Sequence, residues 1–411
     1  MTADINTLDA HKQPSEYLRA QWKTYAKAAA YNIIRSGEID DVNDTIGKSE
    51  AEDGDGKKRK RTGFCTAGTL PGGRVAAAFA EFLAAKSRVD GDIKADGEDD
   101  EVQTAETGDT VGEPAHDRQI YYHPLLPGLL IIPNLVPPTV QKRLLDRMVH
   151  RDLSKPYHQT NMHLHYNLPY PEDSASFFAY PPPANAHSSD VHSTPSTFMP
   201  KDPSVHRPLS IQQVLDKRLH WVTLGGQYDW TNRVYPGGVG ADDEEDDDEE
   251  EPKNPNLPRF PRDLTRLLSA LFPDTVAQAA IVNFYTPGDT MMIHRDVSEE
   301  TDKGLISLSI GCDALFMAAP TGEFDDDKDA QAKSKDGEEP YVLLRLRSGD
   351  AIYMAGHDRF AWHGVPKVIK GTCPDFLADW PAGEHQDGRY EAWRGWMRNK
   401  RVNFNVRQMR D

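Results

Sequence analysis

Apolar and polar residues alternate with a period of two along much of the last third of the chain, which predicts β-strands. Residues 279–285 form a largely apolar run, residues 286–289 (TPGD) have the composition of a turn, and residues 290–294 return to an extended pattern. Further strands are expected at 304–311, 314–319, 341–346, 351–355 and 401–407. We therefore expect a β-rich domain whose strands close around a barrel-like interior.

Other periodic segments precede these strands. Residues 121–136 (YYHPLLPGLLIIPNLV) are predicted to form one apolar strand. Residues 137–153 and 262–272 have the spacing of amphipathic helices, so we expect helices to brace one side of the barrel.

The first 118 residues have a different character. Residues 14–34 and 75–89 have helix-forming composition, whereas 36–63 and 90–117 are rich in glycine and acidic residues. We interpret 1–118 as a mostly disordered, acidic N-terminal arm with short helices, and 119–411 as the folded domain.

Charge is distributed unevenly along the 411 residues, whose formal net charge is −18. Residues 242–251 are all acidic, and 323–339 are strongly acidic, so 237–258 and 321–340 are interpreted as acidic loop insertions. By contrast, residues 389–411 contain seven Lys or Arg and two acids. The negative total therefore does not exclude a nucleic-acid partner, because a local basic rim can attract phosphates.

Several features bear on the compartment. The chain has no secretory signal and no stretch of about 18 apolar residues that could span a bilayer, so we expect a soluble intracellular protein. Cys65, Cys312 and Cys373 share no metal-type spacing, which suits a reducing compartment. The basic run 57–61 is interpreted either as a nuclear import signal or nucleic-acid tether, or as a solvated charge cluster. We expect the nucleus, the cytoplasm or both, with mitochondria left open.

Candidate chemistry begins with His294 and Asp296, which lie two residues apart at a predicted strand end and so point the same way. Two imidazoles and one carboxylate can occupy one face of a metal ion, the geometry that non-heme Fe(II) oxygenases use because it leaves coordination positions open. His363 would complete such a triad. His357 is a rival for that third position.

A second group of histidines competes as a metal site. His163 and His165, with His158 nearby, could serve as zinc ligands. They lie among Tyr, Pro and Asn residues without a paired carboxylate, so we favour a role in a loop or at a pocket edge.

The last predicted strand has one polar face. In 401–407, the polar residues recur at every second position and the apolar ones lie between them. The polar positions are Arg401, Asn403, Asn405 and Arg407. Polar side chains that face a barrel mouth imply a ligand, and a planar guanidinium can hold a carboxylate with two parallel charge-assisted bonds.

These motifs together resemble the AlkB family of Fe(II)- and 2-oxoglutarate-dependent dioxygenases, over roughly residues 120 to 411. The matching motifs are Asn283-x-Tyr285-x-Pro287-Gly288, His294-x-Asp296, His363-Gly364 and Arg401-x-Asn403-x-x-x-Arg407. The closing strand and the segment that starts at Trp221 are most similar to the eukaryotic AlkB homologue one branch. The resemblance implies an α+β protein built on a double-stranded β-helix, or jelly roll.

The same resemblance implies the site residues and cofactors. His294, Asp296 and His363 would be the catalytic iron ligands, and Arg401 would pair with the distal carboxylate of 2-oxoglutarate. Asn283 and Tyr285 would bond beside Arg401, whereas Asn403 and Arg407 would lie near the iron-chelating end. With Fe(II), 2-oxoglutarate and O2, such an enzyme hydroxylates an N-methyl group, and the product collapses to formaldehyde.

The substrate side is less specified. Trp221 and Tyr228 resemble the segment that lines the nucleotide pocket in AlkB-type enzymes, although core packing is an equal reading, and we favour core packing for Trp230. Ser298 is a candidate substrate contact that stands where the bacterial repair enzymes carry a second acid. Direct DNA repair is therefore not inherited from the resemblance.

The sequence favours an oxygenase that demethylates or hydroxylates methylated bases in RNA, especially tRNA, or in DNA. Two alternatives stay open: a 2-oxoglutarate oxygenase that acts on protein lysines, and a non-catalytic binder of methylated nucleic acid. The sequence does not determine the oligomeric state, and we expect a monomer without membrane partners.

Overall fold

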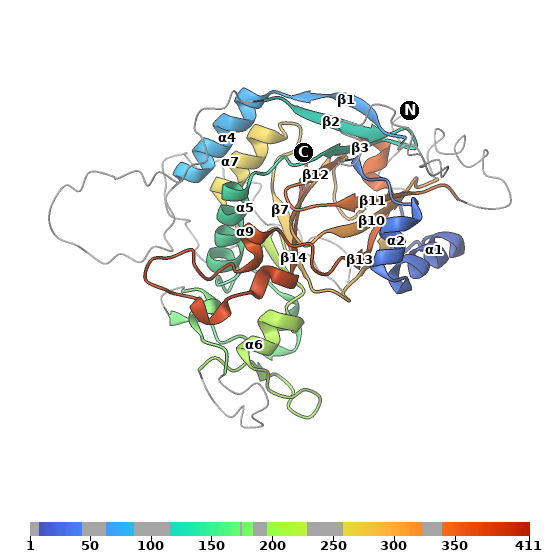
Figure 1. The fold of residues 1–411 in the computed structure, drawn as a ribbon. Coiled ribbons are helices and arrows are strands. Elements are labelled where there is room, and N and C mark those ends of the chain that lie inside the picture. The colour runs from blue at the N-terminus through green and yellow to red at the C-terminus, as the bar shows by residue number, and fades with distance from the viewer. Residues whose placement is uncertain are drawn as a thin grey trace.

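Two antiparallel β-sheets pack face to face and form the centre of the molecule (Figure 1). The computed structural model describes residues 8–42, 63–85, 116–172, 175–183, 195–227, 258–322 and 339–411. Apolar residues from both sheets, such as Ile131 and Ile352 from one and Phe316 and Leu344 from the other, form the core between the sheets. The expected double-stranded β-helix is confirmed.

The larger sheet has eight strands in the order β1-β2-β3-β12-β9-β14-β7-β6. Its strands, in chain order, are β1 (Cys65–Leu70), β2 (Arg118–His123), β3 (Leu126–Ile132), β6 (Trp221–Gly225), β7 (Ala279–Tyr285), β9 (Leu305–Gly311), β12 (Ala351–Met354) and β14 (Arg401–Arg407). The smaller sheet has the order β11-β10-β13-β8. Its strands are β8 (Met291–His294), β10 (Ala314–Ala319), β11 (Val342–Leu346) and β13 (Trp362–Val368).

The strands expected from the alternating pattern in the last third of the chain are confirmed. The single strand expected at 121–136 is wrong, because this segment forms the hairpin of β2 and β3. Its turn follows His123, where Pro124 has no backbone N–H to donate and the Leu125 N–H donates to His123 Nδ1 at 3.1 Å.

Helices cover the outer face of the larger sheet (Figure 1). They include α4 (Gly72–Ala84), α5 (Pro138–Leu145), which continues as the π-helix η2 (Asp146–Asp152), and α7 (Arg262–Leu271). In α7 the buried residues Leu264, Leu267, Leu268 and Leu271 form one apolar stripe, as the spacing predicts. The helices expected at 137–153 and 262–272 are thus confirmed.

Shorter elements complete the described part. They are η3 (Asn161–Leu164), β4 (Tyr166–Asn167), η5 (Phe177–Ala179), β5 (Met199–Pro200), α6 (Ile211–Gln213), η6 (Val214–Arg218), η7 (Gly356–Phe360), α9 (Asp375–Ala378), η8 (Glu391–Trp393) and η9 (Trp396–Asn399). Strands β4 and β5 form a separate two-stranded sheet.

The N-terminal region contributes to this fold. The helices expected at 14–34 are present as α1 (Glu16–Lys27) and α2 (Ala30–Ser36), and α4 corresponds to the helix expected at 75–89. Helix α1 buries an apolar stripe of Leu18, Trp22 and Tyr25 on the outer face of the smaller sheet. Strand β1 pairs with β2. The folded domain therefore begins well before residue 118, and helices cover both sheets.

Part of the acid-rich stretch after α2 is also attached. The Asp40 N–H donates to Leu343 O at 2.8 Å, and Arg347 Nη2 donates to Asp41 Oδ2 at 2.6 Å. Other interpretations fall outside the described residues: the rest of the expected disorder, most of both acidic insertions and the basic run 57–61. Within the described part, no helix is both long and apolar enough to cross a bilayer. The three cysteines are all free.

The buried stripe of α1 leads to a stability prediction. Leu18 is fully buried, so Leu18→Ala removes apolar contacts and leaves a cavity beneath the helix. We expect the free energy of unfolding to fall by about 3 kcal/mol, measured by urea denaturation. Arg19→Ala, at an exposed neighbouring position, is the control and should change it by less than about 0.5 kcal/mol. Equal stability of the two variants would contradict the packed placement of α1.

Candidate active site

Two of the three proposed ligands are brought together by strand register. His294 ends β8, and it lies directly opposite His363 of β13 in the antiparallel pair. The imidazole centroids are 4.5 Å apart. Gly364 permits this close pairing, because a Cβ at that position would lie 2.9 Å from Met291 O on β8.

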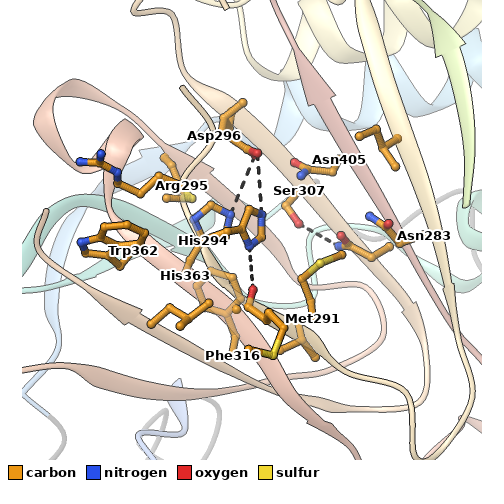
Figure 2. Close-up of a pocket in the computed structure, with 18 of the residues that line it drawn as sticks. Asn283, Met291, His294, Arg295, Asp296, Ser307, Phe316, Trp362, His363 and Asn405 are labelled. Atoms are coloured by element: carbon orange, nitrogen blue, oxygen red, sulfur yellow. Dashed lines mark hydrogen bonds and ion pairs between the residues drawn. The ribbon is translucent and has the colours of Figure 1, made fainter. Parts of the chain in front are cut away.

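Asp296 completes the triad from the loop after β8 (Figure 2). Its Oδ1 lies 3.7 Å from His294 Nε2, and its Oδ2 lies 3.9 Å from His363 Nε2. One ligand atom from each residue lies within 4.8 Å of the other two. The three side chains can therefore reach a common metal ion, as the sequence pattern predicts.

Backbone carbonyls orient both histidines. His294 Nδ1 lies 2.8 Å from Met292 O, and His363 Nδ1 lies 2.9 Å from Ala361 O. A carbonyl oxygen can only accept, so each Nδ1 carries the proton and donates it. Each Nε2 then presents a lone pair toward Asp296, which is the tautomer that a metal ligand requires.

Burial and charge favour the metal-binding protonation states. Burial, together with the neighbouring His294, lowers the pKa of His363 to about 4, which keeps this ring neutral near pH 7. Burial alone would raise the pKa of Asp296. The Arg407 guanidinium outweighs that effect, with help from both histidines and Arg359, and holds the pKa of Asp296 well below its usual range.

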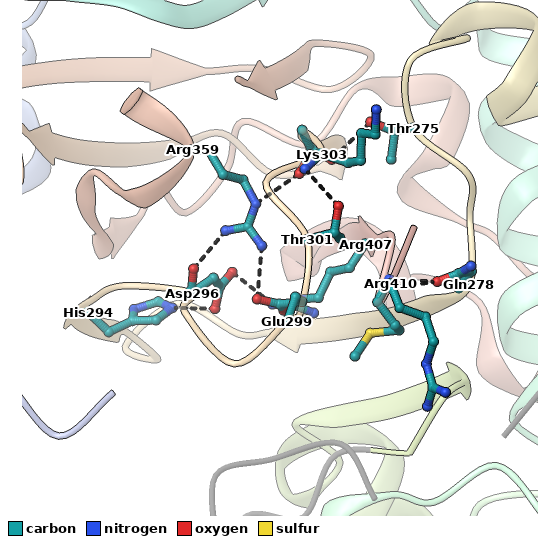
Figure 3. A network of polar contacts seen from close by, with 12 residues as sticks. Thr275, Gln278, His294, Asp296, Glu299, Thr301, Lys303, Arg359, Arg407 and Arg410 are labelled. Carbon is teal, nitrogen blue, oxygen red and sulfur yellow. Dashed lines mark hydrogen bonds and ion pairs between the residues drawn. The ribbon is translucent and has the colours of Figure 1, made fainter. Parts of the chain in front are cut away.

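Two arginines and a second carboxylate support Asp296 (Figure 3). Arg407 Nη2 donates to Asp296 Oδ2 at 2.8 Å, while its Nε lies 2.9 Å from Glu299 Oε1. Arg359 donates to Asp296 O at 2.6 Å and to Glu299 Oε2 at 2.8 Å. Glu299 thus joins two buried guanidiniums, and this chain of contacts fixes the loop that carries Asp296.

Glu299 and Arg359 were missed by sequence reasoning. They lie in the loop after β8 and in η7, where no periodic pattern indicates which side chains turn inward. The cationic partner was partly predicted. Arg407 was expected near the metal, and it is bonded to the ligand carboxylate.

A cavity of about 570 Å³ opens beside the triad. The four polar positions of β14 line it, while Val402, Phe404 and Val406 pack outward against the helices. The two faces of the strand are therefore divided as its alternation predicts. The other predicted residues that line the cavity are Asn283, Tyr285, Trp221 and Ser298. Tyr228 and Trp230 lie outside the described residues.

Arg401 has the surroundings of a carboxylate-binding residue. Its side chain is buried, with Nη2 donating to Ser309 Oγ at 2.8 Å and Nη1 to Cys312 O at 3.2 Å. Its Nε is buried and has no hydrogen-bond partner, and no carboxylate of the described residues forms an ion pair with it. A buried guanidinium in this state is stabilised by an anionic ligand. The residues present fit the dicarboxylate 2-oxoglutarate.

The side-chain amide of Asn403 is held by hydrogen bonds to the neighbouring strand β9. Its amide nitrogen donates to Ser307 Oγ at 2.8 Å and to Leu308 O at 3.1 Å. These bonds to β9 orient the side chain, so that its carbonyl oxygen remains for a ligand. Asn283 lies opposite Asn403 in the β7–β14 register.

The competing histidines do not assemble a metal site. His163 Nδ1 accepts from the Thr160 N–H in the capping box at the start of η3, and His163 Nε2 lies 2.9 Å from Tyr170 Oη. His158 Nδ1 bonds to Asp152 O at 3.0 Å. His357 is exposed on η7. Among the described residues, His294, Asp296 and His363 form the one group with metal-ligand spacing.

Comparisons with known proteins agree with this geometry. The family model described as the 2OG-Fe(II) oxygenase superfamily matches residues 176–407. The chain is 52% identical to the N6-methyladenosine RNA demethylase ALKB1 of Pyricularia oryzae over the full length of both chains. It is 59% identical to the N6-methyladenosine RNA demethylase ALKBH of Cryphonectria parasitica, over 61% of this chain and all of that protein. It is 35% identical to the tRNA demethylase abh1 of Schizosaccharomyces pombe, over 69% of this chain and 80% of that protein.

The triad predicts which histidine is needed for metal binding. His363→Ala removes a buried Nε2 ligand, and we expect the affinity for Mn(II), a redox-stable substitute for Fe(II), to fall at least about 100-fold. His357→Ala, at the exposed rival position, should leave the affinity unchanged. Isothermal titration measures both. A larger effect of His357→Ala would transfer the ligand assignment to His357.

Glu299 allows the support of Asp296 to be tested. Glu299→Gln weakens the bridge between Arg407 and Arg359, so Asp296 should be held less firmly and Mn(II) should bind roughly 10-fold more weakly. Glu300→Gln makes the same change at the adjacent exposed position and is the matched control. Equal Mn(II) affinities for the two variants would show that Glu299 does not position the ligand.

Proposed function

The chain belongs to the 2OG-Fe(II) oxygenase superfamily and, within it, to the AlkB family, and we propose that it removes methyl groups from nucleic-acid bases by oxidation. Its cofactors are Fe(II), 2-oxoglutarate and O2, in keeping with the family and the His-Asp-His triad. The main support is that the triad and Arg401 line the same cavity. Arg401 is buried there, and its Nε has no hydrogen-bond partner.

The chain's own residues hold the reactants. When bound, Fe(II) and 2-oxoglutarate activate O2 so that a substrate methyl carbon is hydroxylated. His294, His363 and Asp296 bind the metal through two neutral nitrogens and one carboxylate oxygen. Arg401 pairs with the distal carboxylate of 2-oxoglutarate, and Asn283 and Tyr285 bond beside it. Asn403 lies nearer the metal-chelating end of the co-substrate. Arg407 keeps Asp296 ionised, and the walls of the cavity exclude bulk water.

N6-methyladenine in RNA is the substrate that we propose first. Two of the relatives above are named for demethylation of N6-methyladenosine RNA, and a third is named a tRNA demethylase. Trp221 lines the cavity and offers an aromatic face for a base that has left its stack. A hydroxylated N-methyl group releases formaldehyde and leaves adenine. The three free cysteines suit the reducing environment of the nucleus or cytoplasm.

The proposal predicts a defined turnover assay. Protein loaded with Fe(II) is supplied with 2-oxoglutarate and RNA or DNA oligomers that carry N6-methyladenine or another methylated base. We expect equal amounts of succinate and formaldehyde, with RNA that contains N6-methyladenine as the preferred substrate. Release of succinate driven by a methyl-lysine peptide, with no response to any oligomer, would contradict the proposal.

Arg401 separates co-substrate binding from metal binding. Arg401→Lys keeps the charge but loses the two-pronged contact, so we expect the KM for 2-oxoglutarate to rise about 10-fold or more. The affinity for Mn(II) should stay close to that of the wild type, because Arg401 makes no contact with the triad. An unchanged KM for 2-oxoglutarate would refute the role assigned to Arg401.

A further inference from the structure

The cavity beside the triad has a wall that comes from the N-terminal segment. Five residues that precede α1 line this cavity together with the triad: Asp9, Ala10, Lys12, Gln13 and Pro14. This segment precedes His294 by at least 280 positions and His363 by at least 349 positions in the sequence. Its placement is produced entirely by tertiary contacts.

Helix α1 holds the segment against the smaller sheet. Trp22 Nε1 donates to Met291 O on β8 at 3.0 Å, and Lys367 Nζ of β13 donates to Ala26 O at 2.8 Å. Figure 1 shows α1, in dark blue, beside the strands of this sheet. The two strands that receive the helix are the strands that carry His294 and His363, so the segment is anchored to the frame of the metal site.

Arg295 makes a second connection at the metal site itself. This residue lies between the ligands His294 and Asp296, and its Nη2 donates to Asp9 O at 3.1 Å. Its Nη1 donates to Thr321 Oγ1 at 2.8 Å, and its guanidinium lies 4.6 Å from the centre of the Trp362 ring. Figure 2 shows Arg295 and Trp362 together, on the side of the triad away from Asn283. The segment is therefore bonded to the loop that positions Asp296.

Two edge strands contribute to the walls of the cavity. Strand β6 is the last strand of the larger sheet, and β8 is the last strand of the smaller one. Trp221 lines the cavity from β6, while the N-terminal segment lines it from the side of β8. The His294 side chain is 38% exposed, which shows that the metal site is accessible to solvent. A base that occupies this cavity would have Trp221 and the N-terminal segment among its neighbours.

The positive charges around the cavity differ in their exposure. Arg295, Arg401 and Arg407 line it as buried side chains with the hydrogen bonds described above. Lys12 also lines it, but its side chain is exposed. The neighbouring Asp9 carboxylate accepts from the His11 N–H at 2.7 Å and so stabilises the local turn. Because Lys12 is exposed and the three arginines are buried, Lys12 is the lining residue best placed to contact a hydrated anion such as a phosphate.

We propose that the segment from Asp9 to Pro14 forms one wall of the nucleotide site and that Lys12 binds a backbone phosphate next to the methylated nucleotide. The proposal rests on the nucleic-acid substrate proposed above. A base that reaches the triad leaves its sugar and phosphates at the rim, because the charged phosphates remain hydrated. A long, flexible ammonium side chain at that rim can contact either adjacent phosphate. This contact carries no sequence information, and it contributes to affinity and register.

Salt dependence distinguishes a phosphate contact from a packing effect. Fluorescence anisotropy measures the Kd of single-stranded RNA with one N6-methyladenine for wild-type protein, Lys12→Ala and Lys12→Arg, with Mn(II) and 2-oxoglutarate bound, at several salt concentrations. Lys12→Ala should weaken binding several-fold and reduce the slope of log affinity against log salt by about 0.7, the value for one phosphate on a single strand. Lys12→Arg should retain both. The affinity for 2-oxoglutarate should be the same in all three proteins.

Lys23→Ala is the matched control. Lys23 is also exposed, it lies on α1, and it does not line the cavity. Lys23→Ala and Lys12→Ala each remove one positive charge, so the overall electrostatic attraction to RNA falls equally in the two variants. A Lys12→Ala protein that matches Lys23→Ala in both Kd and salt slope would overturn the phosphate contact.

The outcomes separate the two proposals. Wild-type protein that demethylates the oligomer while the two alanine variants behave alike refutes the Lys12 contact and leaves the proposed function intact. Wild-type protein that binds the oligomer with the expected Lys12 effect but never releases formaldehyde refutes the proposed function and leaves the contact intact. Wild-type protein that binds no oligomer at any salt concentration overturns both.

Discussion

Asp296 must remain ionised although the protein surrounds it, and the active site depends on how that charge is balanced. Arg407 supplies the nearest compensating charge, and Glu299 and Arg359 hold the loop and the guanidinium in place. Without this arrangement, burial would favour the protonated acid, which is a poor metal ligand. The same network leaves the two histidine Nε2 atoms directed at a carboxylate that is fixed in position.

Strand β14 connects this electrostatic requirement to the fold. Its apolar face packs against the helices, and its polar face carries both Arg401, suited to a dicarboxylate, and Arg407, bonded to Asp296. The two arginines lie at opposite ends of one rigid strand between β7 and β9. Their spacing is therefore set by backbone hydrogen bonds, which keeps the proposed co-substrate and metal sites at a constant separation.

Patterns with a strict period could be predicted from the sequence, and contacts without one could not. The strands and the inward face of β14 follow from alternation along extended segments, and the three metal ligands follow from their motifs and the family resemblance. Glu299 and Arg359 lie in irregular segments, so only the folded chain shows that they meet. Helix α1 was expected as a helix, but three apolar positions in a polar context did not indicate that it packs on the sheet. Its partners, β8 and β13, are distant in sequence.

The central place of β14 also has a consequence for biosynthesis. Both of its neighbours, β7 and β9, precede it in the chain, so a ribosome must translate the residues up to Arg407 before the larger sheet can close. Until then, β7 and β9 each lack a central partner and expose backbone groups that invite pairing with other chains. Truncated translation products would therefore be the forms most prone to aggregation and most dependent on chaperones.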